Sequence, residues 1–101
     1  MKHYSIAPDA AEDLDEIWEY IARDDIDSAD SMLAKIHEQI RALAEMPGMG
    51  HRREDLAEER PLLFWPVGNY LLLYRANRGF VEVVAVVRGR DIPSLLRRRG
   101  L

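Results

Sequence analysis

The sequence predicts an α+β fold in which a hairpin of two helices packs on one face of an antiparallel sheet, in the order β-α-α-β-β-β. Two observations predict it. Apolar residues recur at helical spacing twice in the first half, and three β-rich runs separated by hairpin turns fill most of the second half. With 101 residues, 48 % of them hydrophobic and 32 % charged, the chain has the length and composition of one globular domain spanning residues 1–101.

The first elements are a brief strand and a helix. Residues 4–6 alternate as a strand does, and Pro8 ends the stretch. From Asp9 the apolar residues follow the spacing i, i+3, i+4, i+7, which predicts an amphipathic helix with Leu14, Ile17, Trp18 and Ile21 on its inner face. The acidic residues of this helix are assigned to its solvated outer face: Glu12, Asp13, Asp15, Glu16 and Glu19.

A second helix is predicted to begin at Asp27 or Ser28, since either residue type caps a helix. Its apolar residues, at spacings of four, three, four and three, are Ala29, Leu33, Ile36, Ile40 and Leu43. Pro47 and Gly48 end it. Residues 24–27 form a short polar link, so an antiparallel helical hairpin is expected, followed by a polar loop over residues 48–60.

The three β-rich runs cover residues 62–67, 70–76 and 80–87, and the turns between them predict an antiparallel meander. The last run is almost continuously apolar, which is typical of a central strand covered on both faces. Pro66 favours an edge position for its own strand. A short C-terminal helical turn is expected over residues 93–96, with Arg97, Arg98 and Arg99 as a mobile tail.

The charge is unevenly distributed along the chain. Residues 1–50 hold four Lys and Arg against twelve Asp and Glu, a net of −8, whereas residues 51–101 hold ten Arg against six acids, a net of +4. Zero cysteines exclude disulfides and thiolate chemistry. His3, His37 and His51 are too far apart for a local ligand pair, so we predict neither a metal site nor a cofactor. The N-terminal residues lack the apolar core of a signal peptide, and we expect a cytoplasmic protein without a membrane partner.

Several local patterns resemble one protein family along nearly the whole chain. They are Ala10-x-x-Asp13-Leu14-x-x-Ile17-x-x-Tyr20-Ile21, the helix stop Pro47-Gly48-Met49-Gly50, the run Asn69-Tyr70-Leu71-Leu72-Leu73-Tyr74-Arg75, and Val86-Val87-Arg88-Gly89-Arg90-Asp91 with Leu95-Leu96 after it. In this order they resemble the RelE/ParE superfamily, toxins of bacterial type II toxin–antitoxin modules that are often labelled plasmid-stabilisation proteins.

The superfamily divides by target, and side chains decide between its branches. The RelE-like branch cleaves messenger RNA on the ribosome without a metal, which requires side chains that act as acid and base. By motif matching, an arginine and a tyrosine of that branch fall at Leu71 and near Leu96, and both positions are aliphatic here. Arg90 does match an arginine of that branch, and Arg52 or Arg53 stands where its loop lysines lie. The residues thus favour a non-enzymatic protein, with a RelE-like ribosome-dependent endoribonuclease as the alternative.

The C-terminal segment from Arg88 to Leu96 is similar to the ParE-like branch, whose members block DNA gyrase through protein contact. One departure is that a histidine is common where Arg88 stands. The resemblance implies a growth-arresting toxin neutralised by a cognate ParD-like antitoxin, without sequence-specific nucleic-acid binding, that forms oligomers mainly through the antitoxin complex. A member that has lost toxicity and survives as a binding module is a third hypothesis.

Cationic and aromatic side chains of the second half are the candidate partner-binding residues: Arg75, Arg88, Arg90, Trp65, Arg97 and Arg98. Arg88 and Arg90 lie two positions apart on an extended segment, which places them on one side. For Arg75 the alternative is a pair with Glu82 or Asp91, and for Arg97 and Arg98 it is a solvated tail. Tyr74 and Asp91 are predicted to be structural supports.

Overall fold

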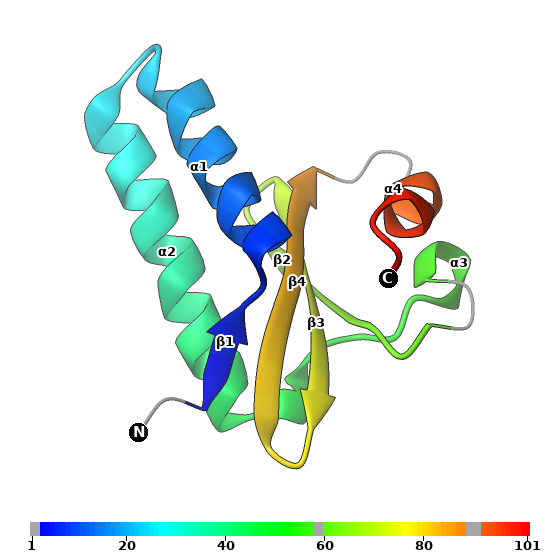
Figure 1. The fold of residues 1–101 in the computed structure, drawn as a ribbon. Helices are drawn as coiled ribbons and strands as arrows, with labels where there is room; N and C mark the ends of the chain where they lie inside the picture. The colour runs from blue at the N-terminus through cyan, green and yellow to red at the C-terminus, as the bar shows by residue number, and fades with distance from the viewer. Residues whose placement is uncertain (1–2, 58–59, 89–91) are drawn as a thin grey trace.

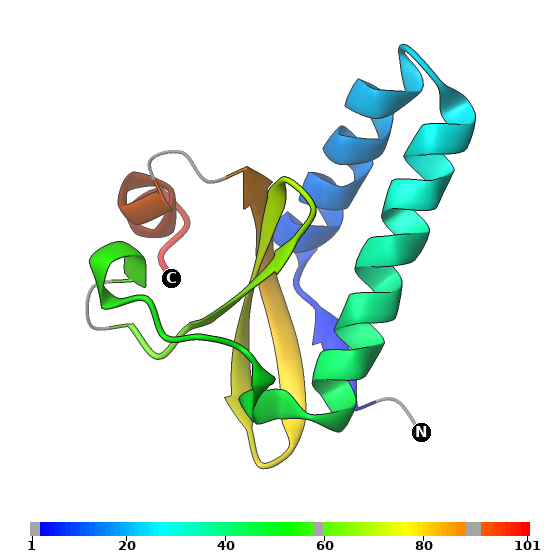
Figure 2. The same cartoon turned by 180° about the vertical axis from the view of Figure 1, so that it is seen from behind.

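A four-stranded sheet lies between two pairs of helices (Figures 1 and 2). The computed structural model describes residues 3–57, 60–88 and 92–101. Its elements are β1 (Tyr4–Ile6), α1 (Pro8–Ala22), α2 (Ile26–Glu45), a 3₁₀ turn η1 (Pro47–Met49), α3 (Glu54–Ala57), β2 (Leu63–Val67), β3 (Tyr70–Asn77), β4 (Phe80–Arg88) and α4 (Ile92–Arg98). Within these described residues no helix has both the length and the apolarity to cross a membrane.

The helical hairpin forms as predicted, but its second helix is capped by a different residue. Asp25, rather than Asp27 or Ser28, is the N-cap: its Oδ1 accepts the backbone N–H groups of Asp27 and Ser28 at 3.0 and 3.4 Å. The hydroxyl of Ser28 donates to Oδ2 at 3.0 Å, and this bond lowers the pKa of Asp25. Trp18 Nε1 donates to Asp30 Oδ1 at 2.8 Å and so joins the two helices.

The strand order is β1-β4-β3-β2. The antiparallel meander of β2, β3 and β4 is confirmed, and β1 adds to it in parallel with β4, so the sheet is mixed. β2 is an edge strand, as Pro66 predicted. Its outer side is partly covered, because His51 exchanges two backbone hydrogen bonds with Phe64. Pro66, two residues on, has no N–H to offer a further strand.

The register of β4 shifts by one residue halfway along the strand. Val84 is an extra residue, a β-bulge opposite the step from Leu73 to Tyr74 of β3. Val83 and Val86 face the same core although they are three positions apart, whereas a regular strand brings only residues two or four positions apart to the same face. The part of β4 beyond the bulge therefore faces the opposite side from the one that uninterrupted alternation gives.

Side chains from the two faces of the sheet build two cores. The core under the helical hairpin is formed mainly by Ala10, Leu14, Ile17, Ile36, Ile40, Leu43, Leu72, Tyr74, Val81, Val83 and Val86. The core under α3 and α4 is formed by Ala57, Leu62, Phe64, Leu73, Val84, Ala85, Ile92 and Leu96. As its apolar run predicted, β4 is an inner strand covered on both faces.

The end of the chain differs from the predicted mobile tail. α4 extends to Arg98, and its fully buried Leu96 belongs to the second core. After the helix, the Leu101 carbonyl accepts a hydrogen bond from Arg60 Nε, while Arg60 Nη1 donates to the Ala57 carbonyl at 3.2 Å. The segment at residues 97–101 is thus tied to α3 rather than free in solvent.

Candidate functional site: a pocket between α1, β4 and α4

A buried carboxylate joins three elements that are distant in sequence. Asp13 is 6 % exposed, and among the described residues it is the buried charged side chain. Its Oδ2 accepts the backbone N–H of Val86 at 3.0 Å and Arg99 Nη1 at 2.8 Å, while Oδ1 accepts Arg99 Nη2 at 2.8 Å. We call these three bonds the Asp13 clasp. They hold α1 against β4 and the segment that follows α4.

The clasp corrects two predictions from the sequence. Asp13 does not lie on the outer face of α1, because Ala10, Asp13, Leu14 and Ile17 are all buried at spacing i, i+3, i+4, i+7. Arg99 is not a tail residue but one partner of a bidentate ion pair, with 23 % of its side chain exposed. The hydrogen bonds that Arg99 donates to Asp13 raise the pKa of Arg99 above its ordinary value.

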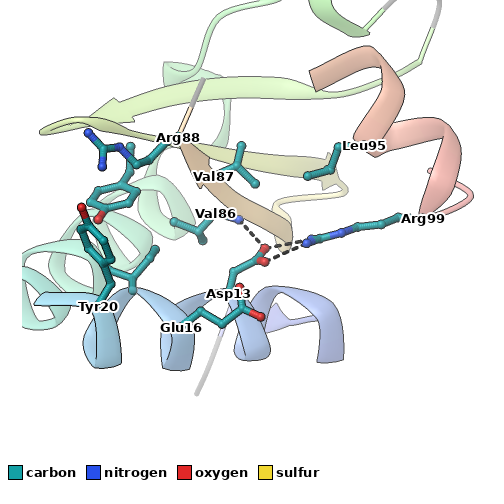
Figure 3. Close-up of a pocket in the computed structure, with 10 residues that line it drawn as sticks. Asp13, Glu16, Tyr20, Val86, Val87, Arg88, Leu95 and Arg99 are labelled. Atoms are coloured by element: carbon teal, nitrogen blue, oxygen red, sulfur yellow. Dashed lines mark hydrogen bonds and ion pairs between the residues drawn. The ribbon is translucent and has the colours of Figure 1, made fainter. Parts of the chain in front are cut away.

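Beside the clasp lies a pocket of about 440 Å³ (Figure 3). α1 contributes Asp13, Glu16, Ile17 and Tyr20, the strands contribute Tyr70, Val86, Val87 and Arg88, and the C-terminal part contributes Leu95 and Arg99. Figure 3 shows Tyr20 and Arg88 at one end of the pocket and Leu95 and Arg99 at the other.

 The Asp13 clasp lies between these two ends. The middle of the pocket thus combines apolar side chains with the Asp13 clasp, and an arginine lies at each end.

The two cations are not equivalent. Arg99 is neutralised by Asp13 at 2.8 Å. The guanidinium of Arg88 lies 5.9 Å from the centre of the Tyr70 ring, a cation–π contact, and within the described part of the chain no carboxylate pairs with it. Arg88 is exposed, and the bulge at Val84 is what turns it toward α1 and this pocket. Arg88 therefore carries a positive charge without an ion-pair partner among the described residues, whereas the carboxylates of the lining, Asp13 and Glu16, act on Arg99.

The structure separates Arg75 from Arg88. Arg75 lies opposite Glu82 in the β3–β4 register, and its Nη1 donates to Glu82 Oε1 at 3.4 Å. Arg88 lies six positions after Glu82 in β4, a distance of about 20 Å along the strand. Tyr74 and Leu72 face the first core, so the side chain of Arg75 starts from the other face of β3. The two arginines do not form one patch.

Trp65 is half-buried against the first core. Its Nε1 donates to Gln39 Oε1 at 2.8 Å, and its ring stacks on His51 with 5.8 Å between the centroids and 16° between the planes. These contacts occupy the indole N–H and one ring face. Less of the aromatic surface is left for a partner than an open edge residue would offer.

Tyr74 supports the fold through its hydroxyl. The hydroxyl donates to the Pro47 carbonyl at 2.7 Å and accepts the Gly50 N–H at 2.8 Å, which holds the turn after α2 against β3. Burial raises the pKa of Tyr74. Gly50 is required by space, since a Cβ at this position would lie 2.3 Å from the tyrosine oxygen.

The other predicted site residues are placed as follows. Arg97 and Arg98 lie in the last turn of α4 and are exposed. Arg90 and Asp91 lie outside the described residues, so the expected alignment of Arg88 with Arg90 stays a prediction. Across residues 3–57, 60–88 and 92–101, no three His, Cys, Asp or Glu side chains are grouped as metal ligands.

The two positions that the RelE-like branch uses for catalysis are both packed. Leu96 is fully buried in the second core, and Leu71 packs against the same core with partial exposure. Neither side chain can transfer a proton. The pocket, with its apolar middle and its exposed guanidinium, has the chemistry of a recognition surface.

Comparisons with known proteins agree with this fold. Residues 4–93 match the family model described as ParE toxin of type II toxin-antitoxin system, parDE. The chain belongs to the ParE toxin family. A protein of Sinorhizobium fredii (strain NBRC 101917 / NGR234), named "Putative toxin Y4kP", is 37 % identical over 78 residues, which cover 77 % of this chain and 78 % of that protein.

A solved structure shows the same fold at lower identity. The chain is similar to one from a structure titled "Chromosomal ParDE TA system from P. aeruginosa", with a TM-score of 0.72 and 19 % identity. The match covers 89 % of this chain and 98 % of the other. The resemblance identified from the sequence is therefore confirmed at the level of family and of fold, including the ParE-like branch.

Proposed function

We propose that this ParE-family toxin acts by binding rather than by catalysis: it inhibits DNA gyrase, arrests growth in the cytoplasm, and is neutralised by a cognate ParD-like antitoxin. The observation that carries the proposal is the burial of Leu96, with Leu71 packed beside the same core. A general acid or base contributes about 10²–10⁴-fold to such a reaction. The positions that supply those groups in the RelE-like branch hold aliphatic side chains here.

The partner-binding role of the arginines belongs to the same proposal. Arg88, Arg97 and Arg98 are exposed near the C-terminal end of the sheet, and Arg75 and Trp65 lie elsewhere, so partners contact them through separate surfaces. Arg90 joins Arg88 in the predicted positive surface. Exposed cations accelerate association with an acidic partner, and salt weakens the effect.

The experiment that tests the proposal is a pair of assays with the purified toxin. A supercoiling assay with purified gyrase is expected to show inhibition, whereas an mRNA cleavage assay on programmed ribosomes is expected to show intact message. Cleavage of the message with supercoiling unaffected would instead identify a RelE-like endoribonuclease. Growth that continues after expression without antitoxin would identify a member that has lost its toxicity.

A second experiment tests the arginines in the antitoxin complex. Single replacements of Arg75, Arg88 and Arg90 by glutamate are expected to slow association, and the difference from wild type should shrink as salt rises. Glutamate at Lys35 of α2, an exposed cation outside the second half, serves as the control. Unchanged affinity and unchanged salt dependence in all three arginine variants would remove these residues from the interface.

A further inference from the structure

Past Val83, the outer edge of β4 pairs with no other strand of the described chain where it borders the pocket. β1 pairs with this side of β4, and its register ends at Val83. Within the described part of the chain no strand continues the sheet on this side toward Arg88. The N–H of Val86 points outward here, because the Asp13 carboxylate accepts it. Alternate residues of a strand present their backbone groups to the same side, so Arg88 presents its own to this edge.

The Asp13 clasp limits how much of this edge a strand can use. Its oxygen already takes the Val86 N–H at 3.0 Å, the position where a partner strand would place a carbonyl. Arg88 follows two residues later and presents its backbone groups to the same edge. The edge therefore suits a short extended segment that begins beyond the clasp rather than a long added strand.

The pocket defines the side chains that such a segment carries. Ile17 and Val86 offer apolar surface in its middle, and Leu95 adds apolar surface toward the Arg99 end, so an apolar side chain is favoured there. Arg88 adds a guanidinium that has no carboxylate partner among the described residues and is held over the Tyr70 ring. In an extended segment residues i and i+2 point the same way. A carboxylate two residues from the apolar side chain would therefore reach the Arg88 end.

We propose that the pocket between α1, the end of β4 and α4 binds an extended segment of a partner protein, with an apolar side chain in the pocket and, two residues away, a carboxylate on Arg88. The inference rests on the proposed function only in that a partner protein supplies the segment. Charge complementarity selects this occupant, because the opposite end of the pocket is already neutralised by the Asp13–Arg99 pair.

The test uses ¹⁵N-labelled full-length toxin and defined peptides. The probe is acetyl-Gly-Leu-Ala-Asp-Gly-amide, and its matched control carries asparagine in place of aspartate. Titration of the probe is expected to shift the backbone amides of Tyr20, Val87, Arg88 and Leu95, and the aspartate peptide should bind about 2- to 5-fold more tightly. Raising salt from low to high concentration should remove that difference.

Two variants separate the charge from the apolar contact. Arg88→Gln should bind both peptides equally, whereas Arg52→Gln, an exposed arginine in a loop remote from the pocket, should leave the preference intact. Tyr20→Ala, whose side chain is 58 % exposed in the wild type, should weaken both peptides alike. All three substituted side chains are exposed, so these variants keep the fold.

Three results would overturn the proposal: no amide shifts at millimolar peptide, equal binding of the two peptides to wild type, or equal effects of Arg88→Gln and Arg52→Gln. Shifts at the pocket that depend on protein concentration without peptide would assign it to a second copy of the chain. None of these results depends on gyrase inhibition, so failure of the peptide site and failure of the proposed function are distinguishable.

Discussion

The helices on the two faces of the sheet differ in length and in what holds them. α1 and α2, with 15 and 20 residues, bury regular apolar stripes against the first core. α3 and α4, with 4 and 7 residues, are too short to form without tertiary contacts. Long-range polar contacts support them: the Asp13–Arg99 pair and the hydrogen bonds of Arg60. The face with the long helices is held by regular apolar stripes, whereas the face with the short helices adds individual long-range polar bonds to its apolar core.

The largest effect is expected from the Asp13 clasp. Asp13→Ala should lower the free energy of unfolding by about 3–5 kcal/mol, because it leaves Arg99 and the Val86 N–H without their carboxylate. Denaturant unfolding measures the loss. Amide hydrogen exchange should show α4 losing protection more than α2 does.

Asp15 provides the control for the clasp, since it is exposed on the same helix. Asp15→Ala should change the stability by no more than about 0.5 kcal/mol. If the two variants unfolded at the same denaturant concentration, the clasp would not be what holds α4.

The next effect concerns the long-helix face, at the turn after α2. Gly50→Ala should destabilise the protein by about 1–3 kcal/mol, because its Cβ would lie 2.3 Å from the buried Tyr74 oxygen. The penalty should shrink in a Tyr74→Phe background, which lacks that oxygen. Gly48→Ala is the matched control, since nothing lies within 4 Å of a Cβ there. Equal thermal unfolding of the two alanine variants would show that Tyr74 moves aside.

The Tyr74 hydroxyl gives this face a pH dependence. Tyr74→Phe should cost about 1–2 kcal/mol at pH 8, because the Pro47 carbonyl and the Gly50 N–H lose their partner. Burial raises the pKa of Tyr74 above 10.0, so above this pH the unfolded state loses its proton first and wild-type stability falls. The gap between wild type and Tyr74→Phe should therefore narrow from pH 10 upward in urea unfolding. A constant gap across this range would contradict the assignment.

The smallest effect is expected for the exposed ion pair. Arg75→Gln should change the free energy of unfolding by less than about 0.5 kcal/mol, since the Arg75 and Glu82 side chains are 38 % and 44 % exposed and 3.4 Å apart. Chemical denaturation at low and high salt measures it beside Asp13→Ala. A loss comparable to that of the clasp would mean that burial does not distinguish the two pairs.

The sequence predicted the elements whose signal is a period. The helical stripes, the hairpin turns and the edge position of the strand with Pro66 are all confirmed. The bulge at Val84 has no periodic signal in the sequence. It falls within residues 83–87, which are all apolar, so each of these side chains is compatible with burial on either face of the sheet. Because the sequence does not predict the bulge, the face of β4 on which Arg88 lies could not be derived from the sequence either.

The candidate site was harder to predict for a different reason. Asp13 was placed outside because it is charged, although its spacing from Ala10 and Ile17 assigns it to the buried stripe. Its partner Arg99 lies 86 residues away, and no local pattern joins them. A carboxylate at an apolar position of a helix is itself the sequence signal that a distant cation completes it.

The separation of 86 residues also orders events during translation. A ribosome adding about 5–20 residues per second makes Arg99 about 4 to 17 s after Asp13, and until then α1 carries an unpaired carboxylate on its inner face. The pairing of β1 with β4 is likewise late, because Tyr4 cannot pair before Val81 has been synthesised. The surface that α1, β4 and Arg99 build together is thus completed only after Arg99 has been synthesised.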